Sequence, residues 1–316
     1  MTIEITGNLP GLPKGRQQVV GKFKRPSAQK MENLDHDLRV LENVLSVLRK
    51  AGYGDILPKD FYTQISNAVR RELDFNRERI FADKIRPDLE VRNRKRETKI
   101  MIPQIIFTSD DLMLETRAEG ISLRNYYNLI EQGQLTVIKE GHANVSKRSV
   151  NRAILSEGLA ELITTGRIHA DLHPGNIFVN KSGNITLIDL GMHEELTQEQ
   201  RFNTIWLLVG LITGNEALIK QTLHRFGWDV GNTITGLERH NFSKNILQLL
   251  RASQKTPNPP PEVISSIIVA ISKLTSYTKD INYKDLFTFL LRSVDKRDIP
   301  QLIIHAIRSG SRDLLN

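Results

Sequence analysis

At 316 residues, the chain is long enough to bury a substantial core as one large domain or as two lobes. Its 39% hydrophobic and 25% charged residues are ordinary for a soluble globular protein and do not suggest long disorder, and the lack of cysteine excludes a disulfide framework and thiolate metal sites. The formal net charge of +8 leaves polyanions and anionic membranes open as partners.

The first residues lack the marks of a signal peptide, since Met1–Pro10 has neither an apolar core nor a basic start. The most apolar stretch, Ile205–Ile212, is shorter than the about 20 residues that a membrane-spanning helix needs. We therefore expect a cytoplasmic protein without a transmembrane segment.

The first predicted strand is Val19–Lys24, preceded by a turn at Lys14–Arg16, while residues 1–18 read as irregular or edge structure. A helix of about four turns follows, because leucines recur every three or four residues. These leucines are Leu34, Leu38, Leu41, Leu45 and Leu48. A second helix is expected from Pro58 to about Ile85.

Further along, strands and then helices are predicted. In chain order they are strands Lys99–Phe107 and Leu112–Glu115, helices Ser122–Gln132 and Ser146–Thr165, hairpin strands Ile177–Val179 and Ile185–Ile188, a helix begun by the Thr197 and Gln200 capping box, and helices Val263–Leu274 and Leu286–Leu291. This order predicts an α+β fold with two lobes. We place a reduced N-lobe at residues 1–118 and a mainly helical C-lobe at residues 119–316.

One stretch carries the chemistry, and it reads H-A-D-L-H-P-G-N-I-F-V-N-K-S-G-N-I-T-L-I-D-L-G over His169–Gly191. Asp171 precedes Asn176 by five positions, a strand pair follows, and Asp189 then stands two residues before Gly191. Kinase-type sites have this order. One Asp takes or orients the proton of the nucleophile, an Asn holds a second metal, and a later Asp joins Mg²⁺ to the nucleotide phosphates.

These residue types suit phosphoryl transfer, in which negative charge spreads over oxygen atoms. Carboxylate and amide oxygens are the protein ligands that Mg²⁺ prefers. A loop pinned by Pro174 and Gly175 can hold Asp171 near an acceptor hydroxyl, and general-base help is worth about 10²–10⁴ in rate. The alternative is a polar turn before a hairpin, with no catalytic role. We set it aside because the Asp and Asn spacing coincides with the H-P-G turn and a D-x-G.

The three histidines nearby are assigned no chemistry. His169 and His173 are expected to brace the loop, and His193 belongs to no motif. At the front of the chain, Lys22 lies on the predicted strand, where kinases use a lysine to hold the α- and β-phosphates. Lys24 has the same strand parity, so the pattern alone does not choose between the two lysines.

Together these segments resemble the UbiB-like atypical kinases, the ubiquinone-biosynthesis kinase group, whose fold is protein-kinase-like. G-K-F-K-R-P resembles the family's V-A-V-K-V-Q-R-P strand, and this selects Lys22. The stretch Arg71–Glu78 resembles its E-L-D-Y-x-R-E helix. H-A-D-L-H-P-G-N and L-I-D-L-G resemble H-A-D-P-H-P-G-N and L-D-F-G. The matches run from about residue 14 to residue 200.

The resemblance implies a role for each matched residue. Lys22 would hold nucleotide phosphates and Glu78 would pair with it, Asp171 would be the catalytic Asp, and Asn176 and Asp189 would be Mg²⁺ ligands. The implied cofactors are ATP and Mg²⁺.

Two further acids, Glu72 and Asp74, match the family's E-x-D element, which contacts an inhibitory N-terminal extension. They are regulatory candidates, and Asp74 and Glu78 would share one helix face at i, i+4. The sequence departs from the family before Val19, where it has no K-x-G-Q and no Ala-rich loop. A lid over the nucleotide is therefore expected to be missing or minimal, which would weaken nucleotide binding.

The resulting expectation is an atypical kinase or ATPase that binds Mg-ATP and supports ubiquinone or lipid biosynthesis. The alternatives are a nucleotide-binding pseudokinase or scaffold without turnover, and an aminoglycoside- or choline-kinase-like phosphotransferase. The expected partners are the nucleotide, a lipid or quinone intermediate, and an anionic membrane to which the protein binds peripherally. The oligomeric state is not predicted.

A dense basic cluster supports the membrane expectation, with a solvated loop as the bland alternative. It comprises Arg92, Arg94, Lys95 and Arg96. No nucleic acid is expected, because the cluster lacks interleaved aromatic residues and the chain carries no known reader motif.

Overall fold

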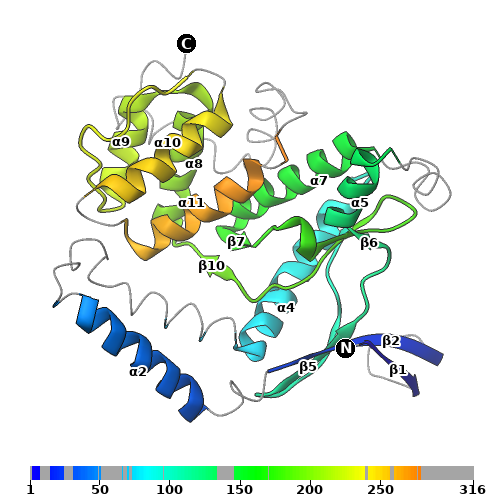
Figure 1. Ribbon diagram of the computed structural model, residues 1–316. Helices are drawn as coiled ribbons and strands as arrows, with labels where there is room; N and C mark the ends of the chain where they lie inside the picture. The colour runs from blue at the N-terminus through cyan, green and yellow to red at the C-terminus, as the bar shows by residue number, and fades with distance from the viewer. Residues whose placement is uncertain are drawn as a thin grey trace. The chain divides into compact units, whose positions relative to one another are not determined.

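A computed structural model gives the fold (Figure 1). It describes residues 2–7, 15–24, 31–48, 50, 66, 70, 73–94, 96–133, 146–169, 171–238, 241–256, 260–275 and 277–278. The chain forms two compact units, of which the first comprises residues 1–145 and 173–192 and the second residues 146–172 and 193–316. The predicted α+β class is confirmed. The predicted lobe boundary at residue 118 stays a prediction.

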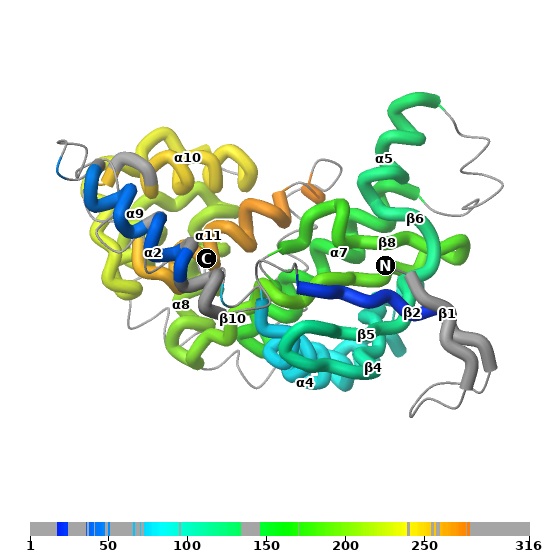
Figure 2. Tube along the Cα trace, turned by 60° about the horizontal axis from the view of Figure 1, so that its bottom comes forward, coloured from blue at the N-terminus to red at the C-terminus, as the bar shows by residue number. Residues whose placement is uncertain are grey.

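The first unit holds a four-stranded antiparallel sheet in the order β1-β2-β5-β4. Its strands are β1 (Thr2–Gly7), β2 (Gly15–Phe23), β5 (Leu112–Thr116) and β4 (Ile105–Thr108), and Figure 2 shows β2, β5 and β4 side by side. Of the two alternatives predicted for residues 1–18, irregular or edge structure, the edge strand is confirmed, whereas the predicted turn at Lys14–Arg16 is wrong at residues 15 and 16, which belong to β2. Residues 2–7 form a full edge strand, and β2 begins four residues before the predicted Val19. The alternation of Ile3 and Ile5 with polar residues was the available signal.

A second sheet of the same unit has the order β3-β9-β8-β6. Its strands are β3 (Ile100–Met101), β9 (Ile185–Leu187), β8 (Ile177–Val179) and β6 (Ile121–Ser122). The predicted hairpin is confirmed as β8 and β9. The predicted single strand Lys99–Phe107 is wrong, because β3 and β4 belong to different sheets. Pro103 lies between them and has no backbone N–H to continue a ladder.

The described part of the first unit also contains the helices α2 (Met31–Leu48), α4 (Phe75–Asn93) and α5 (Leu123–Glu131). Helix α4 contacts β4 and β3 and buries one stripe of side chains. The stripe consists of Phe75, Glu78, Phe81, Ala82, Ile85 and Leu89. The helix predicted from Pro58 to about Ile85 has its start outside the described residues and its end placed too early, and within that range it is interrupted, because α4 begins only at Phe75. Asp74 caps its start and accepts a hydrogen bond from the Arg77 N–H at 3.0 Å, and the helix continues through Pro87 to Asn93.

The second unit is mainly helical. Its helices are α7 (Lys147–Ala160), which continues as one π-helical turn to Thr165, α8 (Gln198–Thr213), α9 (Glu216–Arg225), α10 (Phe242–Lys255) and α11 (Glu262–Thr275). The predicted capping box at the start of α8 is confirmed. The predicted helix Leu286–Leu291 lies outside the described residues.

The apolar stretch of the sequence is the centre of the second unit. Every residue of Asn203–Ile212 in α8 is buried, and α8 contacts both α9 and α10. Burial among neighbouring helices explains the lack of a polar face on α8. None of the helices in the described part of the chain is long and apolar enough to cross a membrane.

Candidate functional site

Lys22 of β2 and Glu78 of α4 meet in the first unit. The Lys22 Nζ lies 2.8 Å from the Glu78 Oε1, and the side chains are 24% and 5% exposed. The strand places Lys22 opposite Met113 of β5, whose side chain is fully buried, and α4 buries Glu78 in its apolar stripe. Lys24, which the pattern could not separate from Lys22, lies instead with its Nζ 5.8 Å from the centre of the Phe75 ring.

Glu115 is a third member of this cluster, and it was not among the predicted site residues. Its Oε1 lies 3.7 Å from the Lys22 Nζ, and its side chain is 6% exposed. Val20 pairs with Glu115 across the strands and Lys22 with Met113, so side-chain alternation puts Lys22 and Glu115 on one face of the sheet. The available signal was an acid in the apolar strand L-M-L-E, where a buried charge needs a partner.

The cluster shifts two pKa values in the same direction. Burial raises the pKa of Glu115 to about 7, and the charges of Glu78 and Asp189 add to the increase while Lys22 opposes it. Burial alone would lower the pKa of Lys22, but Glu115, Glu78 and Asp189 together outweigh it and raise that pKa. Lys22 is therefore a firmly held cation surrounded by acids.

Asp189 and Asn176 flank the β8–β9 hairpin in the same unit. The Ile188 N–H donates to the Asn176 carbonyl at 2.8 Å, so the residue before Asp189 is tied to Asn176. The next residue, Leu190, donates its N–H to the Glu78 Oε1 at 2.9 Å. Asp189 itself has a φ of 61°, the only positive φ of a non-glycine residue in the described ranges, and it is exposed. Glu78 thus joins Lys22 to the backbone next to Asp189.

The donor chemistry of Asn176 and Asp189 fits Mg²⁺, which takes hard oxygen ligands and is usually held by one or two carboxylates together with substrate phosphates and water. The described residues contain no group of three or more His, Cys, Asp or Glu side chains placed to hold a metal. A site with one amide and one carboxylate would leave most ligand positions to the phosphates, as Mg²⁺-nucleotide sites do.

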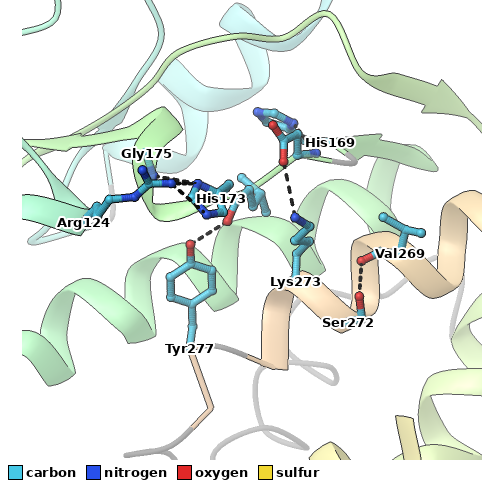
Figure 3. A network of polar contacts seen from close by, with 10 residues as sticks. Arg124, His169, His173, Gly175, Val269, Ser272, Lys273 and Tyr277 are labelled. Carbon is cyan, nitrogen blue, oxygen red and sulfur yellow. Dashed lines mark hydrogen bonds and ion pairs between the residues drawn. The ribbon is translucent and has the colours of Figure 1, made fainter. Parts of the chain in front are cut away.

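His173 is braced from two sides, also within the first unit. The Gly175 N–H donates to the His173 Nδ1 at 3.1 Å, and the Arg124 Nη2 from α5 lies 3.2 Å from the ring nitrogens (Figure 3). A Cβ on Gly175 would lie 3.2 Å from the His173 Nδ1, so the glycine gives the ring room. This arrangement agrees with the structural role expected for His173.

Asp171 belongs to the second unit. Its N–H donates to the His169 Nδ1 at 3.3 Å, so His169 contacts the loop backbone as a brace would. His169 ends β7 (Arg167–His169), which pairs with β10 (His193–Glu195), and His169 lies opposite the buried His193. His193 belongs to no sequence motif, and the structure places it in the β10 strand opposite His169.

Of the two regulatory candidates, Glu72 and Asp74, the structure describes only Asp74. Glu72 lies outside the described residues, as does Lys95 of the basic cluster. Asp74 is the N-cap of α4, one position before its first residue, and its carbonyl accepts the Glu78 N–H at 3.2 Å; that the two side chains share a helix face stays a prediction. The Asp74 backbone is extended, and its carboxylate is turned to the Arg77 N–H of its own helix.

Comparison with known proteins gives one family. Residues 11–223 match the ABC1 atypical kinase-like domain. The chain is 27% identical over 209 residues to the chloroplastic protein ACTIVITY OF BC1 COMPLEX KINASE 3 of Arabidopsis thaliana, a match that covers 62% of this chain and 26% of the relative. It is 29% identical over 175 residues to "Probable protein kinase UbiB" of Pasteurella multocida, which covers 52% of this chain and 29% of the relative.

The chain thus spans less than a third of the length of these two relatives, 26% of the first and 29% of the second. Among solved structures, a Mycobacterium tuberculosis protein in complex with erythromycin is 18% identical with a TM-score of 0.42, covering 84% of this chain and 71% of that one. A likeness at that level says nothing about the ligands of this chain.

Proposed function

Because this chain belongs to the ABC1 atypical kinase-like family, we propose that it binds Mg-ATP and transfers the γ-phosphoryl group to water or to a small or lipid-linked hydroxyl. The observation that carries the proposal is the cluster around Lys22. A half-buried ammonium is held 2.8 Å from the buried Glu78, and the same Glu78 oxygen accepts the N–H of Leu190, next to Asp189. Kinase-type sites need this lysine and glutamate pair and the metal-binding Asp in place together.

Each residue has a distinct task in the proposed reaction. Lys22 contacts the α- and β-phosphates, while Glu78 holds its ammonium. Asn176 and Asp189 would hold Mg²⁺, which would supply positive charge beside the phosphate oxygens. Asp171 accepts the proton of the attacking hydroxyl. The γ-phosphorus–oxygen bond to ADP breaks as the bond to the acceptor oxygen forms, so ADP leaves with the bridging oxygen.

Binding and turnover are tested on the full chain with a Mg-ATP titration followed by ADP release. Asp189→Asn is the variant of choice, because Asn tolerates the left-handed backbone and keeps the size of the side chain. We expect it to lose turnover, while the exposed Asp111→Asn on the same unit keeps it. Equal turnover by the wild type and Asp189→Asn would overturn the proposal.

The same titration separates the enzyme from a nucleotide-binding scaffold. Mg-ATP at 100 times its Kd adds about 2.7 kcal/mol to the free energy of unfolding if it binds only the folded chain. Stabilisation of this size without ADP release would favour the scaffold. Phosphorylation of free small alcohols or aminoglycosides would favour the third alternative.

The acceptor that we propose is a quinone or lipid intermediate at an anionic membrane. The support is the similarity to UbiB and the basic residues Arg92, Arg94 and Arg96 at the C-terminal end of α4, where Arg94 is exposed. Flotation with anionic liposomes at low salt should carry the protein, and Arg92→Gln/Arg94→Gln should weaken this. Absence of binding would remove the membrane part of the proposal, and unchanged quinone levels in cells lacking the protein would remove the quinone part.

A further inference from the structure

We propose that the C-terminal end of α11 and Tyr277 hold the loop residues Asp171 and Leu172 in place. In this arrangement Lys273 is the positioning residue of Asp171. The inference rests on the proposed function, because it concerns the same Asp171. Neither Lys273 nor Tyr277 lies in the part of the chain that matches the family domain, which ends at residue 223.

Lys273 reaches Asp171 across a long span of sequence. Its Nζ lies 3.7 Å from the Asp171 Oδ1, and the two side chains are 38% and 29% exposed (Figure 3). Both residues belong to the second unit, in which α11 contacts β7, the strand that leads into the loop. The pair therefore joins the last described helix to the residue assigned as the proton acceptor.

Tyr277 fixes the residue that follows Asp171. Its hydroxyl donates to the Leu172 carbonyl at 2.6 Å, and its side chain is fully buried, as is the hydrogen bond. A buried tyrosine hydroxyl usually needs such an acceptor. One backbone carbonyl of the loop is thus tied to the turn after α11, just beyond the ion pair that ties Asp171.

Close packing holds α11 in place for both contacts. A Cβ on Gly158 of α7 would lie 2.7 Å from the Leu274 Cδ2 and 3.4 Å from the Leu172 Cδ1. The absence of a side chain at residue 158 lets Leu274, the neighbour of Lys273, and Leu172, the neighbour of Asp171, pack against the same point of α7. The helix, the ion pair and the loop are therefore held as one assembly.

Partial exposure makes the ion pair weak as a source of stability, because water screens its charges. Its geometric effect is larger. An ammonium beside one carboxylate oxygen restricts rotation of the Asp171 side chain, so the carboxylate is presented to the acceptor in one orientation. Misplacing a catalytic group by about 1 Å can cost about 10²-fold in rate. Lys273 should thus matter much more for turnover than for folding.

Crosslinking tests the pair without relying on turnover. A water-soluble carbodiimide activates the Asp171 carboxylate, the Lys273 Nζ displaces the urea by-product, and the resulting amide is found by peptide mass spectrometry of the full chain. The crosslink is expected in the wild type and not in Lys273→Arg. The Lys220 and Glu216 pair, 2.7 Å apart on α9, is the positive control. Crosslinking at the control but not between Lys273 and Asp171 would overturn the proposal.

Kinetics tests the role. Lys273→Met should lower kcat for ADP release about tenfold or more while KM for ATP changes less than about threefold, because the lysine acts on Asp171 and not on the nucleotide. Lys273→Arg should restore kcat to within about threefold, and Lys220→Met should leave it unchanged. Tyr277→Phe should also lower kcat more than it changes KM.

A stability measurement distinguishes positioning from folding. The melting temperature of Lys273→Met should stay within about 4 °C of the wild type, since a part-exposed pair contributes little. Wild-type kcat in Lys273→Met, a loss that Arg does not restore, or a larger fall in melting temperature that parallels the loss of activity would each overturn the positioning role. A wild-type chain without turnover would instead count against the proposed function, and the crosslink would still decide whether the pair exists.

Discussion

The charged side chains of the two candidate site regions, one in each unit, differ in how far they are exposed to water. In the first, Lys22 sits between two carboxylate side chains that are 5% and 6% exposed, Glu78 and Glu115. In the second, Asp171 and Lys273 form a pair that is 29% and 38% exposed. Charges withdrawn from water are costly to leave alone, whereas exposed charges are screened. The first cluster should therefore couple activity to stability, and the second pair should affect activity almost alone.

The largest expected effect is that of Lys22→Met, which leaves two buried carboxylates without their cation. At pH 8 we expect a loss of about 3–5 kcal/mol in the free energy of unfolding, measured by urea denaturation. The loss should be smaller at pH 5, where Glu115 takes up a proton. Lys220→Met on α9 is the matched control, because the side chain of its partner Glu216 is 40% exposed. Equal effects of the two variants would break the comparison.

The second prediction concerns pH. Because the pKa of Glu115 is raised from 4.5 to about 7, the folded chain holds a proton that the unfolded chain releases between these values. Stability from this group is thus present below pH 4.5 and is lost as pH rises to 7, by about 3 kcal/mol. Glu115→Gln removes this loss, so its unfolding free energy relative to the wild type should rise by about that amount between pH 4 and pH 8.

The control for this pH series is Glu131→Gln at the exposed end of α5, for which the difference from the wild type should not vary with pH. A flat difference for Glu115→Gln as well would mean that Glu115 ionises in the folded chain as it does in water. The buried cluster would then lose its main distinction from the pair in the second unit.

An intermediate effect is expected at the start of α4, the helix that carries Glu78. Asp74→Ala removes the side chain that accepts the Arg77 N–H and should cost about 1 kcal/mol by urea denaturation. Asp74→Asn should retain most of this energy, because Asn also caps well. If both variants unfold like the wild type, the cap does not hold the helix that presents Glu78.

The smallest effect should come from the second unit. A double-mutant cycle with Lys273→Met and Asp171→Asn should give a coupling energy of about 0.2–1 kcal/mol in unfolding, as for other exposed pairs. A coupling above about 2 kcal/mol would show that the pair behaves like the buried cluster, and the contrast between the units would disappear.

Local patterns of the sequence predicted local structure well. The β8–β9 hairpin and the α8 capping box follow from spacing within a few residues, and the helices predicted from Ser122 and Ser146 do begin at these two residues, which are their N-caps. The start of α4 was missed because Asp74 was treated as an interior helix residue, although Asp is a favoured capping residue. The choice of Lys22 needed the family resemblance, since strand parity allowed Lys24 equally.

The contacts that the sequence did not predict join residues far apart in the chain, and they depend on which strands and helices pack together. Glu115 meets Lys22 only because β5 pairs with β2, and Lys273 meets Asp171 only because α11 packs on β7 and α7. Neither pairing leaves a periodic trace in the sequence around the residues concerned. The pairing of His169 with His193 is likewise a property of β7 and β10 together.

The left-handed backbone at Asp189 restricts how this position can change over generations. Asp, Asn and Gly adopt a φ near 61° at little cost, whereas other residues, above all β-branched ones, pay for it in strain. A lineage that gave up the proposed metal binding would be expected to pass first through Asn or Gly, because these substitutions preserve the turn beside Leu190. A saturation library at this position, sorted for folded protein alone, should be enriched in these three residues.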